Sequence, residues 1–364
     1  MTATPGLSRL APETFRLPVA KIRSGYYSDA YFTLTKDLLE AEGRHPRVTM
    51  QVFQRQHSVL GGVDEAIAVL KLCAGCDVGG LWREAWAELD VHAGFEGQEI
   101  EPYETVMTIT GDYASFAHLE TVYLGCLARR SLIMRNVREV VAAAAGKPIL
   151  FFPARHDHWL VQTGDGYSAH VAGAIGVSTD AQASWWGGRG VGTVPHSLIA
   201  AYAGDTVAAA TAFAKRYADD MNVTVLVDFD NDSVATALSV ADALGSRLWG
   251  VRLDTSGTLV DRSLLDRMGS FSPTGVNPEL VALVRRALDD AGHGAVRIVC
   301  SGGFDAGKII AFERAGAQVD AYGVGSSLLR GANDFTADIV RVEGRPTAKA
   351  GRCEHPNPVL EHVL

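Results

Sequence analysis

Polar side chains follow five short β-rich runs in the second half of the sequence, at the point where each run ends. The runs cover 148–155, 223–229, 247–254, 296–303 and 320–327. Their ends carry Arg155, His156, Asp228, Arg252, Asp254, Ser301, Gly302, Gly303, Gly323, Gly325 and Ser326. Carboxylates there could bind ribose hydroxyls, hold Mg²⁺ through water or stabilise a cationic transition state, and arginines could bind a carboxylate or a phosphate. One such residue could simply cap a helix, but five polar strand ends in series indicate a site.

Two glycine-containing loops late in the chain predict a phosphate site. The segments SGGFD (301–305) and GVGSS (323–327) each follow a predicted strand. Glycine lets the backbone approach a ligand closely, and N–H groups at the start of a helix bind phosphate. Two neighbouring barrel strands that end in such loops are a frequent phosphate-binding arrangement. We therefore expect a ligand that carries phosphate.

His196 is a further candidate for chemistry. It follows a turn in GTVPHSLIAAY (192–202), at the start of a predicted helix. A histidine at this place can cap or pack the helix, or it can act as a nucleophile or proton carrier. The sequence leaves both interpretations open.

Helical segments separate these runs and define the element order. They cover 206–220, 233–245, 278–292 and 306–317. Strands without strict polar alternation are buried on both faces, and strand–helix units in series form a parallel sheet. Five such units favour an irregular, TIM-like α/β barrel over 148–332, with an open doubly wound sheet as the alternative.

The remaining segments predict a first domain over 1–147. Within it, 61–73 reads as an amphipathic helix, 101–113 as a strand and turn, and 114–146 as two helices. The first 20 or so residues, with several prolines, are expected to form a loose arm. Residues 336–352 read as strand, turn and strand, and we expect 333–364 to return to the first domain because the barrel is already complete.

Composition excludes several classes of protein. Lys and Arg total 33 against 42 Asp and Glu, for a net charge of −9, which argues against nucleic acid or an anionic membrane as the main partner. No apolar run reaches the ~18 residues of a membrane helix, and the first residues lack the apolar core of a signal peptide. The five cysteines include Cys73 and Cys76, interpreted as buried or unreactive thiols on a helix. We expect a cytoplasmic protein.

Nine segments, in this order, resemble the motifs of the nicotinate phosphoribosyltransferase family, whose members are type II phosphoribosyltransferases. They are SGYYSDAYF (24–32), HLETVYLG (118–125), PARH (153–156), GVSTDAQA (176–183), GTVPHSLI (192–199), LVDFDND (226–232), GVRLDTSG (250–257), SGGFD (301–305) and AYGVGSSL (321–328). The resemblance implies transfer of phosphoribosyl from phosphoribosyl pyrophosphate to nicotinate, with Mg²⁺ and often ATP. It also implies an N-terminal α/β sandwich domain beside the barrel, and a homodimer or larger homo-oligomer whose sites lie between subunits.

The resemblance also implies roles for individual residues. Asp29 and Tyr31 match a motif whose aromatic ring stacks on the pyridine from the neighbouring subunit. Arg252 and Asp254 match an Arg-x-Asp strand end that serves the base and the ribose. The glycine loops match the family's phosphate loops, and His196 matches the histidine that ATP-coupled members phosphorylate. Beside these, Asp228 and Asp254 could stabilise the cationic transition state, and Glu120 could add a third carboxylate or simply be a surface helix residue.

Some positions depart from the family pattern. His156 stands where many relatives have a second arginine, so the base pocket carries less positive charge. Thr255 is inserted in the Arg-x-Asp motif, and Thr258 stands where an Asp is frequent. Only Cys353 lies where some archaeal relatives have a cysteine-rich zinc knuckle, so no zinc site is expected.

Three alternatives remain open. The first is a phosphoribosyltransferase for quinolinate, which needs a denser basic pocket, or for nicotinamide, which one positive charge fewer would favour. The second is a barrel lyase or isomerase acting on a sugar phosphate. A Schiff-base aldolase would require a lysine at a strand end, and no predicted strand ends in lysine. The third is a non-catalytic binding protein, which the retained acidic residues disfavour.

Overall fold

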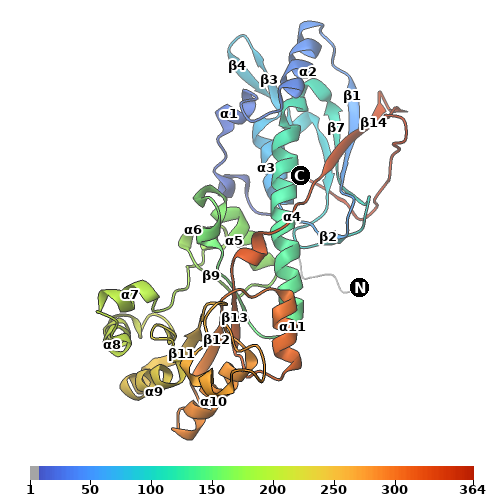
Figure 1. The fold of residues 1–364 in the computed structure, drawn as a ribbon. Helices are drawn as coiled ribbons and strands as arrows, with labels where there is room; N and C mark the ends of the chain where they lie inside the picture. Colours follow the sequence, from blue (N-terminus) through green and yellow to red (C-terminus); the bar gives the residue numbers. More distant parts are fainter. Residues whose placement is uncertain (1–7) are drawn as a thin grey trace. The chain divides into compact units, whose positions relative to one another are not determined.

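The computed structural model describes residues 8–364, which divide into two compact units (Figure 1). The first comprises the chain up to residue 135 together with 331–364, and the second comprises 136–330. The sequence prediction places the boundaries after residues 147 and 332. The first division falls inside a long helix, α4 (Glu120–Ala143), which contributes residues to both units.

The second unit is built on a curled parallel sheet with the strand order β10-β11-β12-β13-β8-β9. The strands are β8 (Ile149–Phe151), β9 (Gly176–Val177), β10 (Val223–Leu226), β11 (Leu248–Leu253), β12 (Arg297–Cys300) and β13 (Ala321–Val324). A short segment joins the two edge strands: the Val191 N–H donates to Val177 of β9 at 2.7 Å, and the Val194 N–H donates to Thr224 of β10 at 2.8 Å. The irregular α/β barrel is therefore confirmed, with the two-residue β9 as a strand that the sequence did not reveal.

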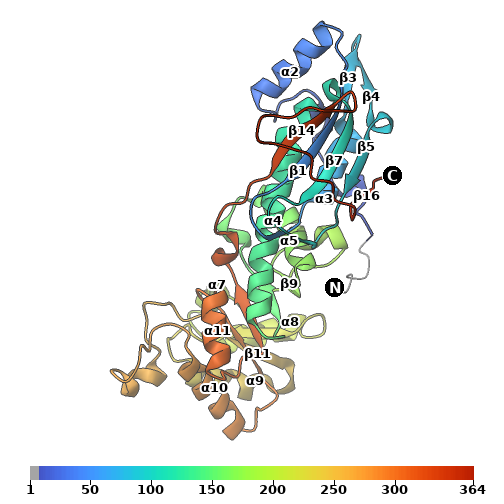
Figure 2. The ribbon, with the colours of Figure 1, turned by 90° about the vertical axis from the view of Figure 1, so that its right-hand side faces the viewer.

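Helices between these strands lie around the sheet (Figure 2). They are α5 (Gln162–Val171), α6 (Asp180–Ala183), α7 (His196–Ala201), α8 (Thr206–Tyr217), α9 (Ser233–Leu244), α10 (Pro278–Asp290) and α11 (Ala306–Arg314). Several begin at a side chain that accepts a backbone N–H, such as Asp232 before α9, Asn277 before α10 and Asp305 before α11. These caps satisfy the first helical N–H groups and fix where each strand-to-helix loop ends.

The first unit packs helices against an antiparallel sheet with the order β15-β14-β1-β7-β5-β16. The strands are β1 (Arg47–Phe53), β5 (Asp90–Ala93), β7 (Thr105–Asp112), β14 (Thr336–Val342), β15 (Arg345–Pro346) and β16 (Glu361–His362). Apolar side chains of α3 (Val63–Cys73) and of α4 form one buried core with those of β1 and β7. Pairing of β14 with β1 confirms that the C-terminal segment returns to the first unit and completes its sandwich.

Three expectations for the first unit are wrong. Residues 114–146 form two short 3-10 turns followed by one helix, α4, because the segment 120–143 has no proline and its one glycine, Gly125, is not enough to break the helix. Cys73 ends α3, but Cys76 lies on β3 (Gly75–Val78), which pairs with β4 (Leu81–Glu84). Residues 1–7 of the expected loose arm lie outside the described residues, and the next part is held because Asp64 pairs with Arg9 at 3.0 Å.

The other elements of this unit are short apart from one helix. They are α1 (Val19–Arg23), α2 (Ala30–Ala41), β2 (Ser58–Val59) and β6 (Glu99–Ile100). Among the residues that the structure describes, no helix is both long enough and apolar enough to cross a membrane.

Candidate active site

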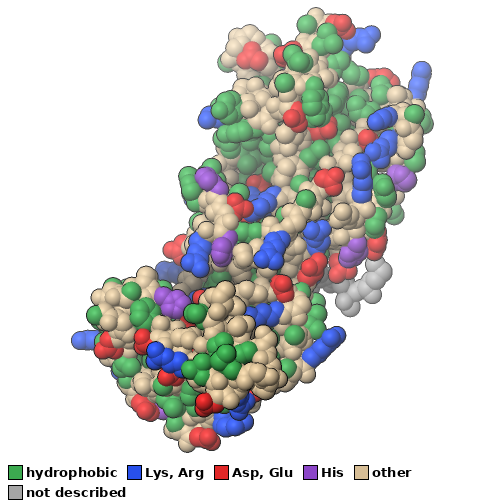
Figure 3. Space-filling model, in the orientation of Figure 1, with side chains coloured by type: hydrophobic (Ala, Val, Ile, Leu, Met, Phe, Trp, Pro, Cys, Tyr) green, Lys and Arg blue, Asp and Glu red, His purple; other side chains and the backbone are tan. Residues whose placement is uncertain are grey.

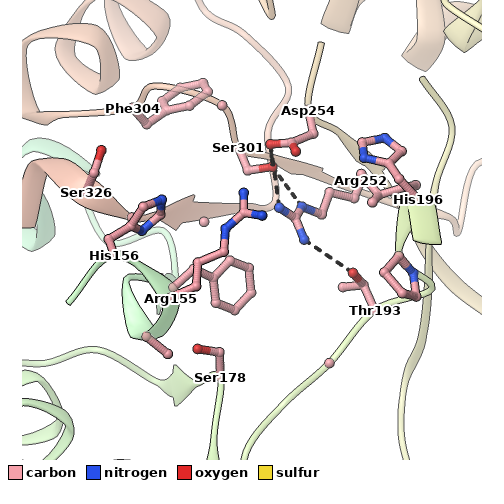
Figure 4. A pocket seen from close by; sticks show the side chains of 18 of the residues that line it. Arg155, His156, Ser178, Thr193, His196, Arg252, Asp254, Ser301, Phe304 and Ser326 are labelled. Atoms are coloured by element: carbon pink, nitrogen blue, oxygen red, sulfur yellow. Dashed lines mark hydrogen bonds and ion pairs between the residues drawn. The ribbon is translucent and has the colours of Figure 1, made fainter. Parts of the chain in front are cut away.

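A pocket of about 730 Å³ lies in the second unit, at the ends of the parallel strands (Figure 4). The predicted residues that line it are Arg155, His156, His196, Arg252, Asp254, Ser301, Gly302, Gly303, Gly323, Gly325 and Ser326. They come from four strand ends and from the first residue of α7. Most of the predicted residues therefore lie in one cavity, because parallel strands place their carboxyl ends at one edge of the sheet.

Arg252 is held rigidly at the centre of this pocket. Its Nε donates to Ser301 Oγ at 2.7 Å and its Nη1 to Thr193 Oγ1 at 3.3 Å, while its Nη2 lies 3.5 Å from Asp254 Oδ1. Ser301 Oγ also donates to Asp254 Oδ1 at 2.6 Å. The Phe152 ring packs against the guanidinium, with its centroid 5.2 Å away. The network fixes the plane of the guanidinium before any ligand binds, which lowers the entropy cost of binding.

Arg155 differs from Arg252 because it is exposed and has no ion-pair partner among residues 8–364. Figure 4 shows both guanidinium groups directed into the central part of the pocket. Next to Arg155, the ring of His156 lies close to Gly325. A Cβ atom added to Gly325 would lie 3.1 Å from Cε1 of that ring. The pocket thus presents one oriented cation and one free cation to an anionic ligand.

The two glycine loops expose backbone donors. Gly302 and Gly303 have φ of +90° and +67°, a backbone conformation that favours glycine. Within the described part of the chain, the N–H groups of residues 302–304 have no protein acceptor. The Ser327 hydroxyl donates to the Phe304 carbonyl at 2.7 Å and so ties the second loop to the first. Successive unpaired N–H groups lining a pocket are suited to bind phosphate oxygens.

His196 and Asp228 form a pair at the edge of the pocket. His196 Nε2 lies 3.0 Å from Asp228 Oδ1, and the two side chains are 42% and 7% exposed, respectively. Asp228 does not line the pocket itself, so the structure places this carboxylate behind the histidine. The hydrogen bond that His196 donates to Asp228 raises the pKa of His196 above its usual value, and burial opposes this shift. An imidazole whose Nε2–H donates to Asp228 leaves Nδ1 with the free electron pair.

Replacing Asp228 by Asn tests this electrostatic coupling. We expect the pKa of His196 to fall in Asp228→Asn, because the neutral amide no longer stabilises the imidazolium. An NMR titration of the histidine ring signals measures the shift. Asp230→Asn, an exposed carboxylate two residues along the same loop, should leave the His196 titration unchanged. An unchanged or higher pKa in Asp228→Asn would contradict the assigned pair.

The other predicted site residues, Asp29, Tyr31 and Glu120, belong to the first unit. Asp29 Oδ2 accepts a hydrogen bond from Thr121 Oγ1 at 2.9 Å, and the Tyr31 hydroxyl lies 3.5 Å from the same oxygen. Glu120 begins α4 and is 9% exposed. Burial, followed by the charges of Asp338 and Asp29, raises its pKa to about 8. A largely neutral Glu120 contributes little negative charge near pH 7, so the predicted charge-stabilising role would need this carboxyl to ionise.

The raised pKa of Glu120 predicts a dependence of stability on pH. Its pKa in the folded protein, about 8, exceeds the ordinary value of 4.5, so stability that is present below 4.5 is lost as the pH rises through 8. Glu120→Gln cannot ionise, so its free energy of unfolding should gain roughly 4 kcal/mol relative to the wild type between about pH 5 and about pH 9. Denaturant unfolding at both pH values measures the free energy of unfolding of the variant and of the wild type. Glu139→Gln, exposed on the same helix, is the control, and an equal change in both variants would refute the interpretation.

Sequence reasoning missed several residues that line the pocket. They are Phe152, Ala154, Ser178, Val191, Gly192, Thr193, Pro195, Ser197, Leu226 and Phe304. Ser178, Thr193 and Ser197 fall inside two of the nine family-like segments, so the signal was present but no single residue was assigned. Phe304 also lies inside such a segment, SGGFD (301–305), whereas Phe152 gave no signal, because an aromatic residue next to a buried strand usually belongs to the core.

Comparison with known proteins agrees with the fold. Residues 29–131 match the family described as quinolinate phosphoribosyl transferase, N-terminal domain. A crystal structure of nicotinate-nucleotide pyrophosphorylase from Pyrococcus furiosus aligns with a TM-score of 0.77 and 34% identity, over 93% of this chain and 81% of that one. Human nicotinic acid phosphoribosyltransferase aligns with a TM-score of 0.64 and 17% identity, over 90% and 77% of the two chains, and so supports the fold alone.

Two curated relatives come from Mycobacterium tuberculosis. The nicotinate phosphoribosyltransferases pncB1 and pncB2 are 30% and 31% identical to this chain, over 71% and 73% of its length. The chain spans about half the length of these relatives, 55% of each. The barrel with its pocket, joined to the sandwich unit, defines a type II phosphoribosyltransferase fold. Within that class, the chain belongs to the nicotinate phosphoribosyltransferase family.

Proposed function

We propose that this protein is a nicotinate phosphoribosyltransferase acting in NAD biosynthesis or salvage. It would convert nicotinate and phosphoribosyl pyrophosphate into nicotinate mononucleotide and pyrophosphate. The observation that carries the proposal is that one pocket holds the oriented Arg252, the exposed Arg155 and the N–H groups of residues 302–304, which have no protein acceptor among the described residues. That combination suits a ligand with separate phosphate and carboxylate groups.

The chemistry needs positioning and charge rather than proton transfer. The lone pair of the pyridine nitrogen forms a bond to the anomeric carbon, while the bond from that carbon to pyrophosphate breaks and the pyrophosphate leaves with the electron pair. The transition state resembles an oxocarbenium ion. Asp254, 23% exposed and fixed by Ser301, supplies a carboxylate that stabilises this cation.

Mg²⁺ would arrive with the pyrophosphate group of the substrate. Among residues 8–364 no group of three or more His, Cys, Asp or Glu side chains is arranged to hold a metal. Mg²⁺ usually keeps several waters and uses one or two carboxylates with the substrate phosphates, so the carboxylate of Asp254 in the pocket would suffice as its protein ligand.

The base preference follows from the charges near Arg155. Nicotinate has one carboxylate, which one free arginine can pair with, whereas quinolinate has two. His156 supplies less positive charge than an arginine would, which favours nicotinate over quinolinate. Among the described residues that line the pocket there is no lysine, which supports a transferase rather than an aldolase that uses a Schiff base.

A panel of bases tests the proposal. The protein is incubated with phosphoribosyl pyrophosphate and Mg²⁺ plus nicotinate, nicotinamide or quinolinate, and chromatography identifies the mononucleotide. We expect nicotinate to give the largest kcat/KM. A preference for nicotinamide or quinolinate would overturn the choice of base, and no product from any base would overturn the reaction.

We further propose that the active assembly is a homo-oligomer in which the first unit of one subunit contributes to the pocket of another. Exposed apolar side chains on α2 support this: Tyr31, Leu34 and Leu38 are 60%, 66% and 59% exposed, and their spacing places them along one helical face. Figure 3 shows apolar side chains gathered over this part of the unit. Mixing the Tyr31→Ala and Arg252→Met variants should restore activity that each variant lacks alone. Light scattering verifies that the mixture is oligomeric. If an oligomeric mixture recovers no activity, a site shared between subunits is contradicted.

A further inference from the structure

Lys308 lies on α11, directly after the first glycine loop, and its side chain reaches back to that loop. Its Nζ donates to the carbonyl of Gly302 at 3.0 Å. The ammonium also lies 4.3 Å from the ring centroid of Phe304 and 5.8 Å from that of Phe312. Lys308 is half-buried and does not line the pocket, so it contacts the loop without sharing the cavity.

The contact fixes the direction of one peptide group. In a trans peptide the C=O and the following N–H point in opposite directions. The Gly302 carbonyl points to Lys308, so the Gly303 N–H points away from Lys308. No protein acceptor for that N–H exists in the described part of the chain, and residues 302–304 line the pocket. Because two glycines in succession leave this peptide free to rotate, a constraint is needed to keep the carbonyl out of the phosphate site.

We propose that Lys308 is a positioning residue that holds the 302–303 peptide with its N–H directed into the pocket and so prepares the loop to bind phosphate. The inference rests on the proposed function, since it assigns Lys308 to the phosphate-bearing substrate. Without Lys308 the peptide could rotate and present a carbonyl oxygen, which repels phosphate, where a donor is required.

The contacts of the Lys308 side chain fit a role in positioning the loop better than a purely structural role in α11. The start of α11 is already capped by Asp305, whose carboxylate accepts the Lys308 N–H at 2.9 Å. Burial lowers the pKa of the Lys308 ammonium. The groups in contact with the ammonium are the loop carbonyl and two aromatic faces, and α11 does not need these contacts in order to fold.

Lys308→Met, which keeps the length and apolar stem of the side chain, removes the donor and the charge. We expect its KM for phosphoribosyl pyrophosphate to rise by tenfold or more, as for loss of a hydrogen bond to a charged group, while the KM for nicotinate stays within about twofold. Calorimetry should show the same weakening for pyrophosphate. Lys308→Arg should recover most of the affinity. Lys215→Met, an exposed lysine on α8, is the charge-matched control.

The outcomes separate this inference from the proposed function. If the wild type binds phosphoribosyl pyrophosphate and Lys308→Met binds it equally well, the positioning role is overturned and the proposed function stands. Equal weakening of nicotinate and phosphate ligands, or failure of Lys308→Arg to rescue, would also overturn it. If the wild type binds none of these phosphates, the proposed function fails and the inference falls with it.

Discussion

Arg252→Met should lower kcat/KM for nicotinate mononucleotide formation by roughly a thousandfold. Three side chains hold this guanidinium: Ser301 at 2.7 Å, Thr193 at 3.3 Å and Asp254 at 3.5 Å. Its loss removes an oriented cation from the centre of the pocket and leaves the Asp254 carboxylate without its counter-charge. Binding of both substrates depends on this arrangement of Arg252 and Asp254, so we expect kcat and KM to change together.

Steady-state kinetics with both substrates varied would measure this effect. Arg247→Met is the matched control, because Arg247 is exposed just before β11, the strand that ends near Arg252. We expect Arg247→Met to retain wild-type kinetics. A loss of less than about tenfold in Arg252→Met, with the fold intact, would show that the reaction does not use this arginine.

His196→Ala should abolish any acceleration of the reaction by ATP. We propose that Nδ1 of His196, whose Nε2 faces Asp228 at 3.0 Å, attacks the γ-phosphorus of ATP. The bond to the bridging oxygen breaks, ADP leaves with that electron pair, and the phosphoryl group remains on the histidine. The ratio of rates with and without ATP should then fall to about one in the variant.

Labelled ATP provides a direct measurement of this step. Wild-type protein should acquire an acid-labile, base-stable phosphoryl label, and His196→Ala should acquire none. His293→Ala is the control, because His293 is also paired with a carboxylate, Asp242 at 2.8 Å, but lies away from the pocket. Equal labelling of wild type and His196→Ala would place the phosphoryl group elsewhere, and an ATP effect that persists in the variant would exclude coupling through this histidine.

The barrel could be predicted because its strands are buried on both faces. Each of β8 and β10–β13 leaves a short apolar run that ends in polar or glycine residues, and those ends brought Arg155, Arg252 and Asp254 to one pocket. β9 spans two residues, Gly176 and Val177, which is too short to leave a pattern. The 191–194 segment joins the edge strands through hydrogen bonds that no side-chain periodicity records.

Local chemistry was harder to predict than the positions of the strand ends. A strand-end carboxylate can face the cavity or support a neighbour, and only the fold shows that Asp228 contacts His196. The raised pKa of Glu120 arises from burial and from Asp338, a residue far away in sequence. Lys308 gave no signal because its function depends on the direction of one peptide group.

The most direct test of the account is a ³¹P NMR time course of phosphoribosyl pyrophosphate and Mg²⁺ with the protein, run with and without nicotinate. With nicotinate, the account predicts that the substrate signals disappear while pyrophosphate and nicotinate mononucleotide form in equimolar amounts, so that the pyrophosphate signal, from two phosphorus atoms, grows twice as large as the new phosphomonoester signal. Without nicotinate the substrate should persist. Loss of substrate at the same rate in both samples, or no loss in either, would contradict phosphoribosyl transfer to the base.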